Sequence, residues 1–312
     1  MTRRLLILAN PIAGGGRARA LAPALASALR ARGADAEVFL TQRAGDAGTR
    51  ARDAGAEAWD ALVAIGGDGT VNEVLNGMPD PSRPLGVLPL GTANVLARTY
   101  RLPRTADAAA AMLLDGHTRT HAIGRANGRR FLLFCGSGLD AAVVRRVQQV
   151  RTGTLGKHKW VLPILHVVRR WPRYALRVTL PDGEVLDDLG SVLVARVRDF
   201  GGVVQLTPEV DPASGLLHVL CFRARARTAW ALLGARAALG RMRPGPGLAV
   251  RAVPALRIDG RAPCQIDGDW LPGAVGPDRD LDRIDLDLDP RPARLLAPPP
   301  AAGDPLHAAT PG

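Results

Sequence analysis

The sequence predicts an α/β domain, with a parallel sheet and helices on both of its faces, followed by a mostly β, sandwich-like domain. Over roughly the first 120 residues, short apolar runs alternate with helical stretches, which is typical of a parallel sheet buried on both faces. Beyond that point, short strands are separated by turn signals such as Pro181 to Gly183. We therefore expect one domain over residues 1–122 and a β-rich domain over residues 123–289.

The first domain is expected to contain four buried strands, at residues 5–9, 36–41, 61–65 and 85–90. The stretch 17–32 has helical composition and stops at Gly33, a common residue just after a helix end. Further helices are expected at 46–58, at 70–75 and in the segment that reaches residue 114. Ligands of such sheets bind beyond the carboxyl ends of the strands. The loops that follow the strands are therefore the first candidates for a site.

The second domain is expected to contain strands at residues 131–134, 174–180, 191–197, 216–222, 249–258 and 281–288. Helical insertions are predicted near residues 139–150, 157–171 and 227–240. From Pro290 onward the chain is rich in Pro and Ala and has no apolar period. We therefore predict that residues 290–312 form a disordered tail.

The composition narrows the classes of partner. A formal net charge of +12 is compatible with anionic partners, but Lys157 and Lys159 are the only lysines, and an Arg-rich composition is also what a GC-rich genome produces. Three cysteines without a Cys-x-x-Cys pair indicate neither a zinc site nor a disulfide framework. No nucleic-acid module is recognisable and only 4% of residues are aromatic, so no nucleic-acid partner is expected.

The loop from Gly66 to Thr70 lies directly between an expected strand and an expected helix. Its glycines let the backbone adopt positive φ and approach a ligand closely, and N–H groups at the start of the helix can bind phosphate. Asp68 would stand at the end of the strand, where it can hold Mg²⁺ directly or through water. The structural alternative is a tight turn in which Thr70 and Glu73 form a capping box. Capping alone does not require three glycines around an aspartate, which favours ligand binding.

Two further loops are expected at the same edge of the sheet. The first, Asn10 to Gly16, lacks the Lys-Ser/Thr of a P-loop and is not a Gly-x-Gly-x-x-Gly fingerprint. The other, Pro89 to Asn94, contains Thr92 and Asn94, which are also ordinary helix N-cap residues. Each loop alone is a weak signal. Three such loops at one edge indicate a nucleotide-binding site, and hence an α/β nucleotide-binding domain.

These stretches resemble the diacylglycerol kinase catalytic-domain family, which includes bacterial lipid kinases and sphingosine and ceramide kinases. The matching stretches are Asn10-Pro11 with Gly14 to Gly16, Thr41 with Gly45 to Ala47, Gly66 to Glu73 with Asn76-Gly77, Leu90 to Thr92 with Asn94, Ala97 and Arg98, Gly136 to Ala141, and Gln265 to Asp269. The Gly-Gly-Asp-Gly-Thr loop is also found in NAD kinases, whereas the Leu-Gly-Thr-x-Asn stretch and the late acidic motif favour a lipid kinase.

The resemblance implies an ATP-dependent lipid kinase that uses Mg²⁺ and transfers the γ-phosphoryl group to a lipid hydroxyl in a cleft between the domains. The nucleotide-binding residues that it implies, together with the loop residues considered above, are Asn10, Pro11, Ile12, Ala13, Gly14, Thr41, Gly66, Gly67, Asp68, Gly69, Thr70, Val71, Asn72, Glu73, Thr92 and Asn94. The acceptor can be diacylglycerol-like, a sphingoid base or ceramide, and the sequence does not name it.

In this family a late Asp-Gly-Glu acid is taken as the proton acceptor. Here Asp269 stands at that position, one methylene shorter, and Asp267 precedes it. We expect Asp269 to be the general base, with Asp267 and Asp68 as the other catalytic candidates. The alternative is a hairpin turn, because Asp-Gly is among the strongest hairpin signals.

The family often has a structural metal near an Asp-x-x-Asp-Gly-x-Leu-Asp stretch. Here Asp211 begins the corresponding segment, and Ser214 and His218 replace two of the acids. The resemblance therefore leaves only Asp211 and the Leu216 carbonyl as candidate ligands of a structural Mg²⁺.

The segment from Lys157 to Trp171 mixes basic, aromatic and apolar residues. It can lie on an anionic membrane surface, or it can be an ordinary helix packed on the β domain. The apolar run near the N-terminus is too short for a signal peptide, and no window has the roughly 20 apolar residues of a membrane span. We expect a cytoplasmic protein that contacts the inner face of the membrane transiently, and a homodimer is left open.

Two other functions stay open at this point. One is a kinase of a soluble acceptor, as in NAD kinase. The other is a catalytically silent nucleotide- or lipid-binding protein, suggested by the shortened acid at Asp269.

Overall fold

The computed structural model describes residues 2–150, 166–167, 169–170, 173–201, 204–207, 209–223, 230, 233, 236, 242–245, 247–271 and 280–300. It divides into two compact units, one of residues 1–122 with 290–312 and one of residues 123–289. Of the three predicted helical insertions, the first is α6 (Leu139–Val150). The other two, at 157–171 and 227–240, fall almost entirely outside the described residues.

The first unit is an α/β layer structure, as predicted. Its sheet has the order β2-β1-β3-β4-β20-β5, with β1 (Arg4–Ala9), β2 (Asp35–Leu40), β3 (Ala61–Gly66), β4 (Leu85–Pro89), β5 (Thr118–His121) and β20 (Ala293–Leu296). All neighbours pair in parallel except β20 and β5, so the sheet is mixed only at this edge.

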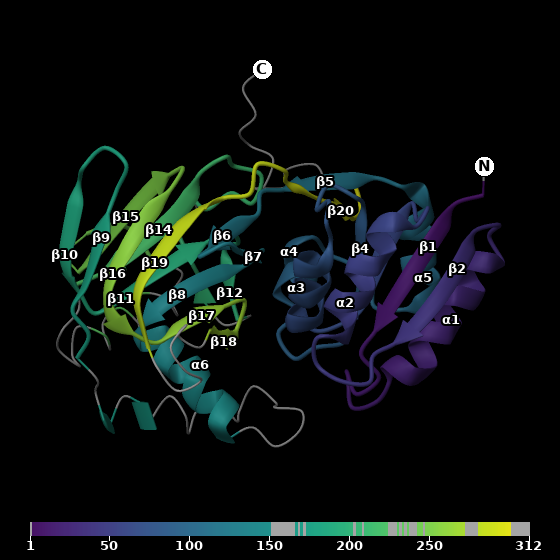
Figure 1. Ribbon diagram of the computed structural model, residues 1–312, viewed down its shortest axis with the longest axis horizontal. Helices are drawn as coiled ribbons and strands as arrows, with labels where there is room; N and C mark the ends of the chain where they lie inside the picture. Colours follow the sequence, from purple (N-terminus) through teal and green to yellow (C-terminus); the bar gives the residue numbers. More distant parts are fainter. Residues whose placement is uncertain are drawn as a thin grey trace. The chain divides into compact units, whose positions relative to one another are not determined.

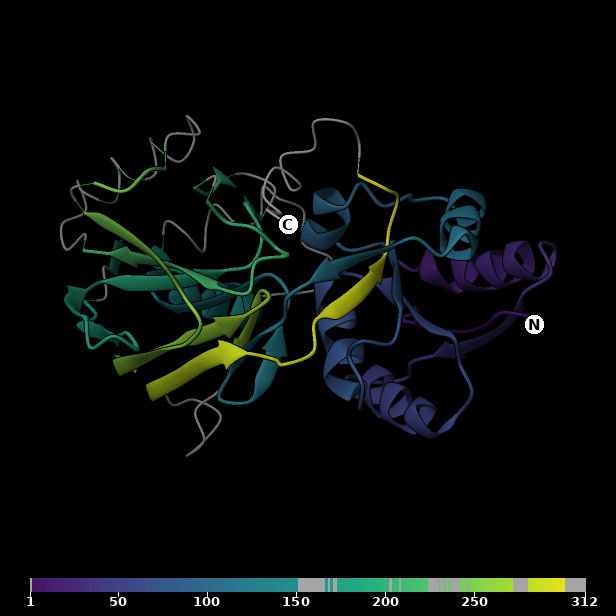
Figure 2. The ribbon, with the colours of Figure 1, turned by 90° about the horizontal axis from the view of Figure 1, so that it is seen from above.

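Helices cover both faces of this sheet, because the buried strands present apolar side chains to both sides. On one face, α1 (Ala18–Arg30) packs with α5 (Ala106–Asp115); on the other, α2 (Asp46–Asp53) packs with α3 (Asp68–Gly77) (Figures 1 and 2). A short 3-10 helix (Ala54–Ala56) follows α2, and α4 (Val95–Thr99) follows the loop after β4.

Strand β20 shows that the predicted disordered tail is wrong at its beginning. Residues 293–296 lie between β4 and β5, drawn in yellow in Figure 2, and Leu295 and Leu296 are buried. A strand this short has no detectable period, and its partners are far away in the sequence. Burial of its leucines between two strands outweighs the cost of ordering a few residues.

The second unit is a sandwich of two mostly antiparallel sheets. One has the order β10-β9-β16-β19-β6-β7, with β6 (Gly124–Ala126), β7 (Arg129–Phe131), β9 (Leu176–Thr179), β10 (Val185–Leu189), β16 (Leu256–Ala262) and β19 (Leu281–Leu288). The other has the order β15-β14-β11-β8-β17-β18, with β8 (Phe134–Gly138), β11 (Ser191–Ala195), β14 (Leu217–Phe222), β15 (Leu248–Val253), β17 (Cys264–Ile266) and β18 (Asp269–Leu271). Strands β12 (Asp199–Phe200) and β13 (Val204–Gln205) form a separate hairpin.

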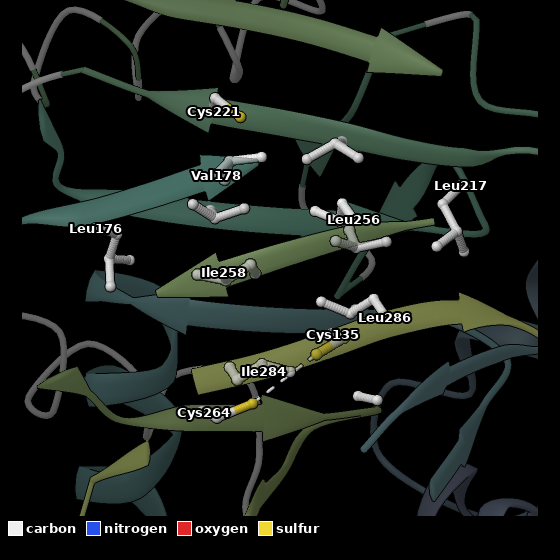
Figure 3. Close-up of a cluster of buried hydrophobic side chains, with 14 of the residues drawn as sticks. Cys135, Leu176, Val178, Leu217, Cys221, Leu256, Ile258, Cys264, Ile284 and Leu286 are labelled. Atoms are coloured by element: carbon white, nitrogen blue, oxygen red, sulfur yellow. Dashed lines mark hydrogen bonds between the residues drawn. The ribbon is translucent and has the colours of Figure 1, made fainter. Parts of the chain in front are cut away.

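The core of this unit is apolar and is built from both sheets (Figure 3). Val178, Ile258 and Ile284 come from one sheet, and Cys135 and Cys264 from the other. All three cysteines are buried, and none is paired in a disulfide in the structure.

Two predicted strands of the second unit are corrected by the structure. Residues 131–134 are not one strand: Phe131 ends β7 and Phe134 begins β8. Leu132 and Leu133 connect the two strands, because the backbone there turns around a carboxylate. Residues 249–258 are two strands, β15 and β16, which lie in different sheets. Pro254 separates them, and proline cannot donate a hydrogen bond within a sheet.

Candidate functional site

Four strand-end loops meet at one edge of the α/β sheet. The N–H of Asn10 donates to the Ile65 carbonyl at 3.0 Å, and the N–H of Thr41 donates to the Ala9 carbonyl at 3.0 Å. The N–H of Leu90 donates to the Gly66 carbonyl at 2.8 Å. The structure therefore brings the predicted nucleotide-binding loops together, each fixed by the strand beside it.

The first of these loops has an open backbone. Gly14, Gly15 and Gly16 all have positive φ, between 62° and 93°, a conformation that side chains other than glycine rarely adopt. Within the described residues, the N–H groups of Gly14 and Gly15 donate to no backbone carbonyl. Ile12 in the same loop is 73% exposed. The loop thus offers N–H donors to a ligand and presents an apolar side chain to solvent.

The loops after β3 and β4 touch through two glycines. A Cβ at Gly91 would lie 2.5 Å from the Gly67 Cα, so any larger residue there would push the two loops apart. Helix α3 starts at Asp68, directly after Gly67. The first N–H groups of a helix have no carbonyl partner within it and favour an anion. A helix start of this kind favours an anion such as phosphate.

The capping box considered for Thr70 and Glu73 is wrong, since no side chain caps the start of α3. Glu73 instead reaches α2, where its Oε1 accepts the N–H groups of Ala47 at 3.0 Å and Gly48 at 3.4 Å. Glu73 therefore holds two helices together beside the edge. A capping box at the start of α3 therefore does not explain the Gly66 to Thr70 loop.

Asp68 caps another helix. Its Oδ2 accepts the N–H of Val95 at 3.1 Å, and its Oδ1 accepts the N–H of Leu96 at 3.3 Å, at the start of α4. Burial raises the pKa of Asp68, against the opposing effect of these donors. Hydrogen bonds from the backbone of Asp68 itself and of Asn94 also act on this carboxylate and lower its pKa. Asp68 is therefore a structural anchor of the loop after β4 that can also hold a cation directly or through water.

The remaining predicted nucleotide-binding residues differ in exposure. Thr92 is exposed, whereas the side chains of Thr70, Val71 and Asn72 are buried. Asn94 has a positive φ of 46° and forms two hydrogen bonds to the backbone of Gly91, so it closes its own loop. Backbone groups, rather than these buried side chains, are what this part of the edge presents.

In the second unit, the Asp267 to Asp269 turn has two carboxylates with different environments. Asp267 is 7% exposed, and its carboxylate accepts the N–H groups of Leu132 at 2.9 Å, Leu133 at 2.8 Å and Phe134 at 2.9 Å. The connection between β7 and β8 is therefore wrapped around this carboxylate. These three hydrogen bonds give the Asp267 carboxylate a structural role.

Asp269 is half-buried, and its Oδ1 accepts a hydrogen bond from Gln148 Nε2, on α6, at 3.1 Å. The side chain of Gln265 also holds the turn. Gln265 Oε1 accepts the Gly268 N–H at 2.9 Å, and Gln265 Nε2 donates to Asp140 Oδ2 at 3.3 Å. Asp269 is thus the more accessible of the two acids and is held at both sides.

Sequence reasoning did not assign roles to Asp140, Gln148, Gln265 and Ser191. Ser191 Oγ donates to Asp140 Oδ1 at 2.9 Å, and burial raises the pKa of Asp140. In the structure, a Cβ at Gly136 would lie 1.8 Å from Asp140 Oδ2, so only glycine leaves room for this carboxylate.

The structural metal site suggested for Asp211 and Leu216 does not fit the structure. The Leu216 carbonyl accepts a hydrogen bond from Arg196 Nη1, and Asp211 Oδ1 accepts the Ala213 N–H at 2.9 Å. Among the described residues, no group of three or more His, Cys, Asp or Glu side chains is arranged to hold a metal ion.

No helix within the residues that the structure describes is long and apolar enough to span a membrane.

Comparison with known proteins identifies the family. The model of the diacylglycerol kinase catalytic domain matches residues 4–126, and that of the YegS C-terminal NAD kinase beta sandwich-like domain matches residues 134–280. Crystal structures from Bacillus anthracis have the same fold. One, of a diacylglycerol kinase, has a TM-score of 0.70 at 20% identity and covers 95% of this chain and 97% of its own. Another has a TM-score of 0.75 at 22% identity, with coverages of 95% and 96%.

Curated relatives agree with the family models. The diacylglycerol kinase of Staphylococcus epidermidis is 28% identical over 222 residues, which cover 70% of each chain. That of Mycobacterium tuberculosis is 31% identical over 233 residues, which cover 72% of this chain and 75% of the relative. Both domains, in this order, match across most of the chain, and it therefore belongs to the diacylglycerol kinase catalytic-domain family.

Proposed function

We propose that this protein is an ATP-dependent lipid kinase, which transfers the γ-phosphoryl group of ATP to a hydroxyl group of a lipid. Membership of the family supports kinase activity at the family level. The observation that supports the proposal most is the environment of Asp269. It is a half-buried carboxylate fixed by Gln148, beside an acid that is already engaged by the backbone.

ATP would bind at the strand-end edge of the α/β sheet. The open N–H groups of Gly14 and Gly15, and the start of α3 after Gly67, are donors suited to phosphate oxygens. The donor chemistry at Asp68 fits Mg²⁺, which favours carboxylate oxygen and would neutralise charge on the phosphoryl group. In this assignment Asp68 also holds the loop after β4, so that one carboxylate links the metal and the loop.

Asp269 would act as the general base. It accepts the proton of the lipid hydroxyl as the hydroxyl oxygen forms a bond to the γ-phosphorus and the bond to the departing ADP breaks. We assign Asp267 a positioning role, because its three N–H donors stabilise the charged carboxylate and so disfavour its protonation. Gln148 would fix which oxygen of Asp269 faces the substrate.

The Asp140 carboxylate would set the position of the base indirectly. It holds Gln265, and Gln265 holds the N–H of Gly268, which precedes Asp269. A chain of hydrogen bonds between side chains and backbone restricts the turn more than strand pairing alone. These two hydrogen bonds would help to hold the shorter Asp269 in place.

The test is a phosphorylation assay with labelled ATP and a panel of acceptors: diacylglycerol, ceramide, sphingosine, a whole lipid extract and NAD. We expect labelled phosphate in at least one lipid and none in NAD. Transfer to NAD alone would replace the proposal by a kinase of a soluble acceptor. Binding of ATP without transfer to any lipid in the extract would contradict catalysis and leave a nucleotide-binding protein.

A further inference from the structure

Arg196 is a fully buried arginine with an unusual set of acceptors. It lies just after β11 and has 0% exposure. Its Nη2 donates to the carbonyls of Pro212 at 2.7 Å and Ser214 at 2.8 Å, and its Nη1 donates to the Leu216 carbonyl. One guanidinium thus gathers three carbonyl oxygens of a single loop.

This loop, residues 211–218, contains Asp211 and the Leu216 carbonyl, the two candidate ligands of a structural metal ion. A bound Mg²⁺ or Ca²⁺ is held by a ring of oxygen ligands that includes backbone carbonyls. Here the guanidinium donates to the Leu216 carbonyl, which was the candidate backbone ligand, and to two further carbonyls. A divalent ion at these oxygens would also stand next to a buried positive charge, which repels it strongly in a medium of low dielectric constant.

The charges of the loop match the single positive charge of a guanidinium better than the double charge of a divalent metal ion. Ser214 and His218 are neutral residues at two positions where the family pattern has acids. His218 is 4% exposed and brings no negative charge to the loop. Two carboxylates that would balance a divalent ion are therefore absent, while the carbonyls that a planar guanidinium can bind are retained.

We propose that the guanidinium of Arg196 replaces the structural metal ion in the 211–218 loop, so that the loop folds without a divalent cation. Arginine suits this role because it stays charged when buried and presents several donors in a fixed plane. The inference is independent of the kinase activity.

The local readout is hydrogen exchange of the amides at residues 211–218 in the full-length protein, measured by mass spectrometry after EDTA treatment and again with excess Mg²⁺ or Ca²⁺. We expect exchange rates that agree within about twofold in all three conditions, since metal binding to the folded loop would otherwise protect it. If amide exchange in this loop slows about tenfold or more with either ion, a metal ion binds to the folded loop. That result would overturn the proposal.

A second measurement removes the guanidinium of Arg196. Arg196→Met should lower the melting temperature by about 5 °C or more, because one buried and two part-buried carbonyls lose their donor. Arg177→Met is the control, since Arg177 forms an exposed ion pair with Asp187 and its loss should shift the melting temperature by only about 1 °C. A melting temperature of Arg196→Met equal to that of the control would contradict the role of Arg196.

The triple variant Arg196→Met, Ser214→Asp, His218→Asp restores the acids of the family pattern. We expect its 211–218 amides to become protected by Mg²⁺ or Ca²⁺, in contrast to the wild type. If Arg196→Met does not fold, the hydrogen-exchange measurement on the wild-type protein still tests the proposal.

Discussion

The two regions assigned to the chemistry place polar groups in different ways. At the strand-end edge of the α/β unit, the polar groups are backbone N–H groups in glycine-rich loops, held by strands that are neighbours in the sheet. At the Asp267 to Asp269 turn of the β unit, they are side-chain carboxylates whose partners lie up to 135 residues away in sequence. Binding of phosphate can therefore rest on local backbone shape, whereas placement of a base depends on the whole sandwich.

This difference separates substitutions that affect one function from those that affect the fold. A side chain added to a strand-end loop should weaken nucleotide binding while the sheet persists. A change at the Asp267 to Asp269 turn should either unfold the β unit or stop the chemistry, depending on which of its two acids is altered.

The largest effect is expected for Asp267→Asn. The amide cannot accept three N–H bonds and turns its own donors toward them, so the free energy of unfolding should fall by about 3–5 kcal/mol. Denaturant unfolding measures it, and Asp187→Asn, in an exposed ion pair, is the control with a loss below about 1 kcal/mol. If Asp267→Asn is as stable as the wild type and yet inactive, then Asp267 is the base and the two acids exchange roles.

Asp269→Asn comes next and should act on rate alone. The amide keeps the contact with Gln148 within reach but cannot take a proton, so kcat should fall by roughly 10²-fold or more, with stability changed by less than about 1 kcal/mol. ATP affinity should not change, because nucleotide binding is assigned to the other unit. Asp269→Glu is the partner variant; it restores the family's usual acid and should remain active. Wild-type kcat in Asp269→Asn would rule out a catalytic carboxylate at this position.

Gly91→Ala tests the backbone contact at the strand-end edge. The added Cβ would lie 2.5 Å from Gly67 Cα and 2.9 Å from Asn94 Oδ1, so the two loops must separate. We expect the Kd for ATP to rise by about tenfold, the cost of a displaced donor set, which calorimetric titration measures. Gly215→Ala is the matched control, since nothing lies within 4 Å of its added Cβ. An unchanged Kd in folded Gly91→Ala would remove this contact from the nucleotide site.

The same difference explains what the sequence could predict. Strands β1 to β4 and the loops after them were predictable, because a short apolar run followed by glycines is a local signal. Strand β20 was missed, since its four residues are recognisable as a strand only when β4 and β5 are already in place. The role of Asp267 was missed for the same reason, because its donors lie 133 to 135 residues away in sequence. The role of Arg196 was missed although its acceptors lie only 16 to 20 residues away, because backbone carbonyls carry no residue-specific signal.

The smallest effect concerns the pH dependence of the β unit, where buried side chains rather than backbone loops respond to protons. Burial lowers the pKa of His218 to about 4, and its Nδ1 has no hydrogen-bond partner within the described residues. The unfolded chain, with an ordinary histidine pKa of about 6.5, binds this proton more readily than the folded chain does. Stability therefore rises with pH from about 4 to 6.5 and is complete above that range.

Between pH 6.5 and 5.5 this one group should reduce the free energy of unfolding by about 1 kcal/mol. The measurement is denaturant unfolding of the wild type and of His218→Gln at both pH values. Carboxylates that titrate in this range contribute equally to the two proteins, so the difference between their pH dependences isolates His218. We expect His218→Gln to lose about 1 kcal/mol less than the wild type over this interval. Equal losses would mean that His218 is protonated in the folded protein, and that a second positive charge is tolerated beside Arg196.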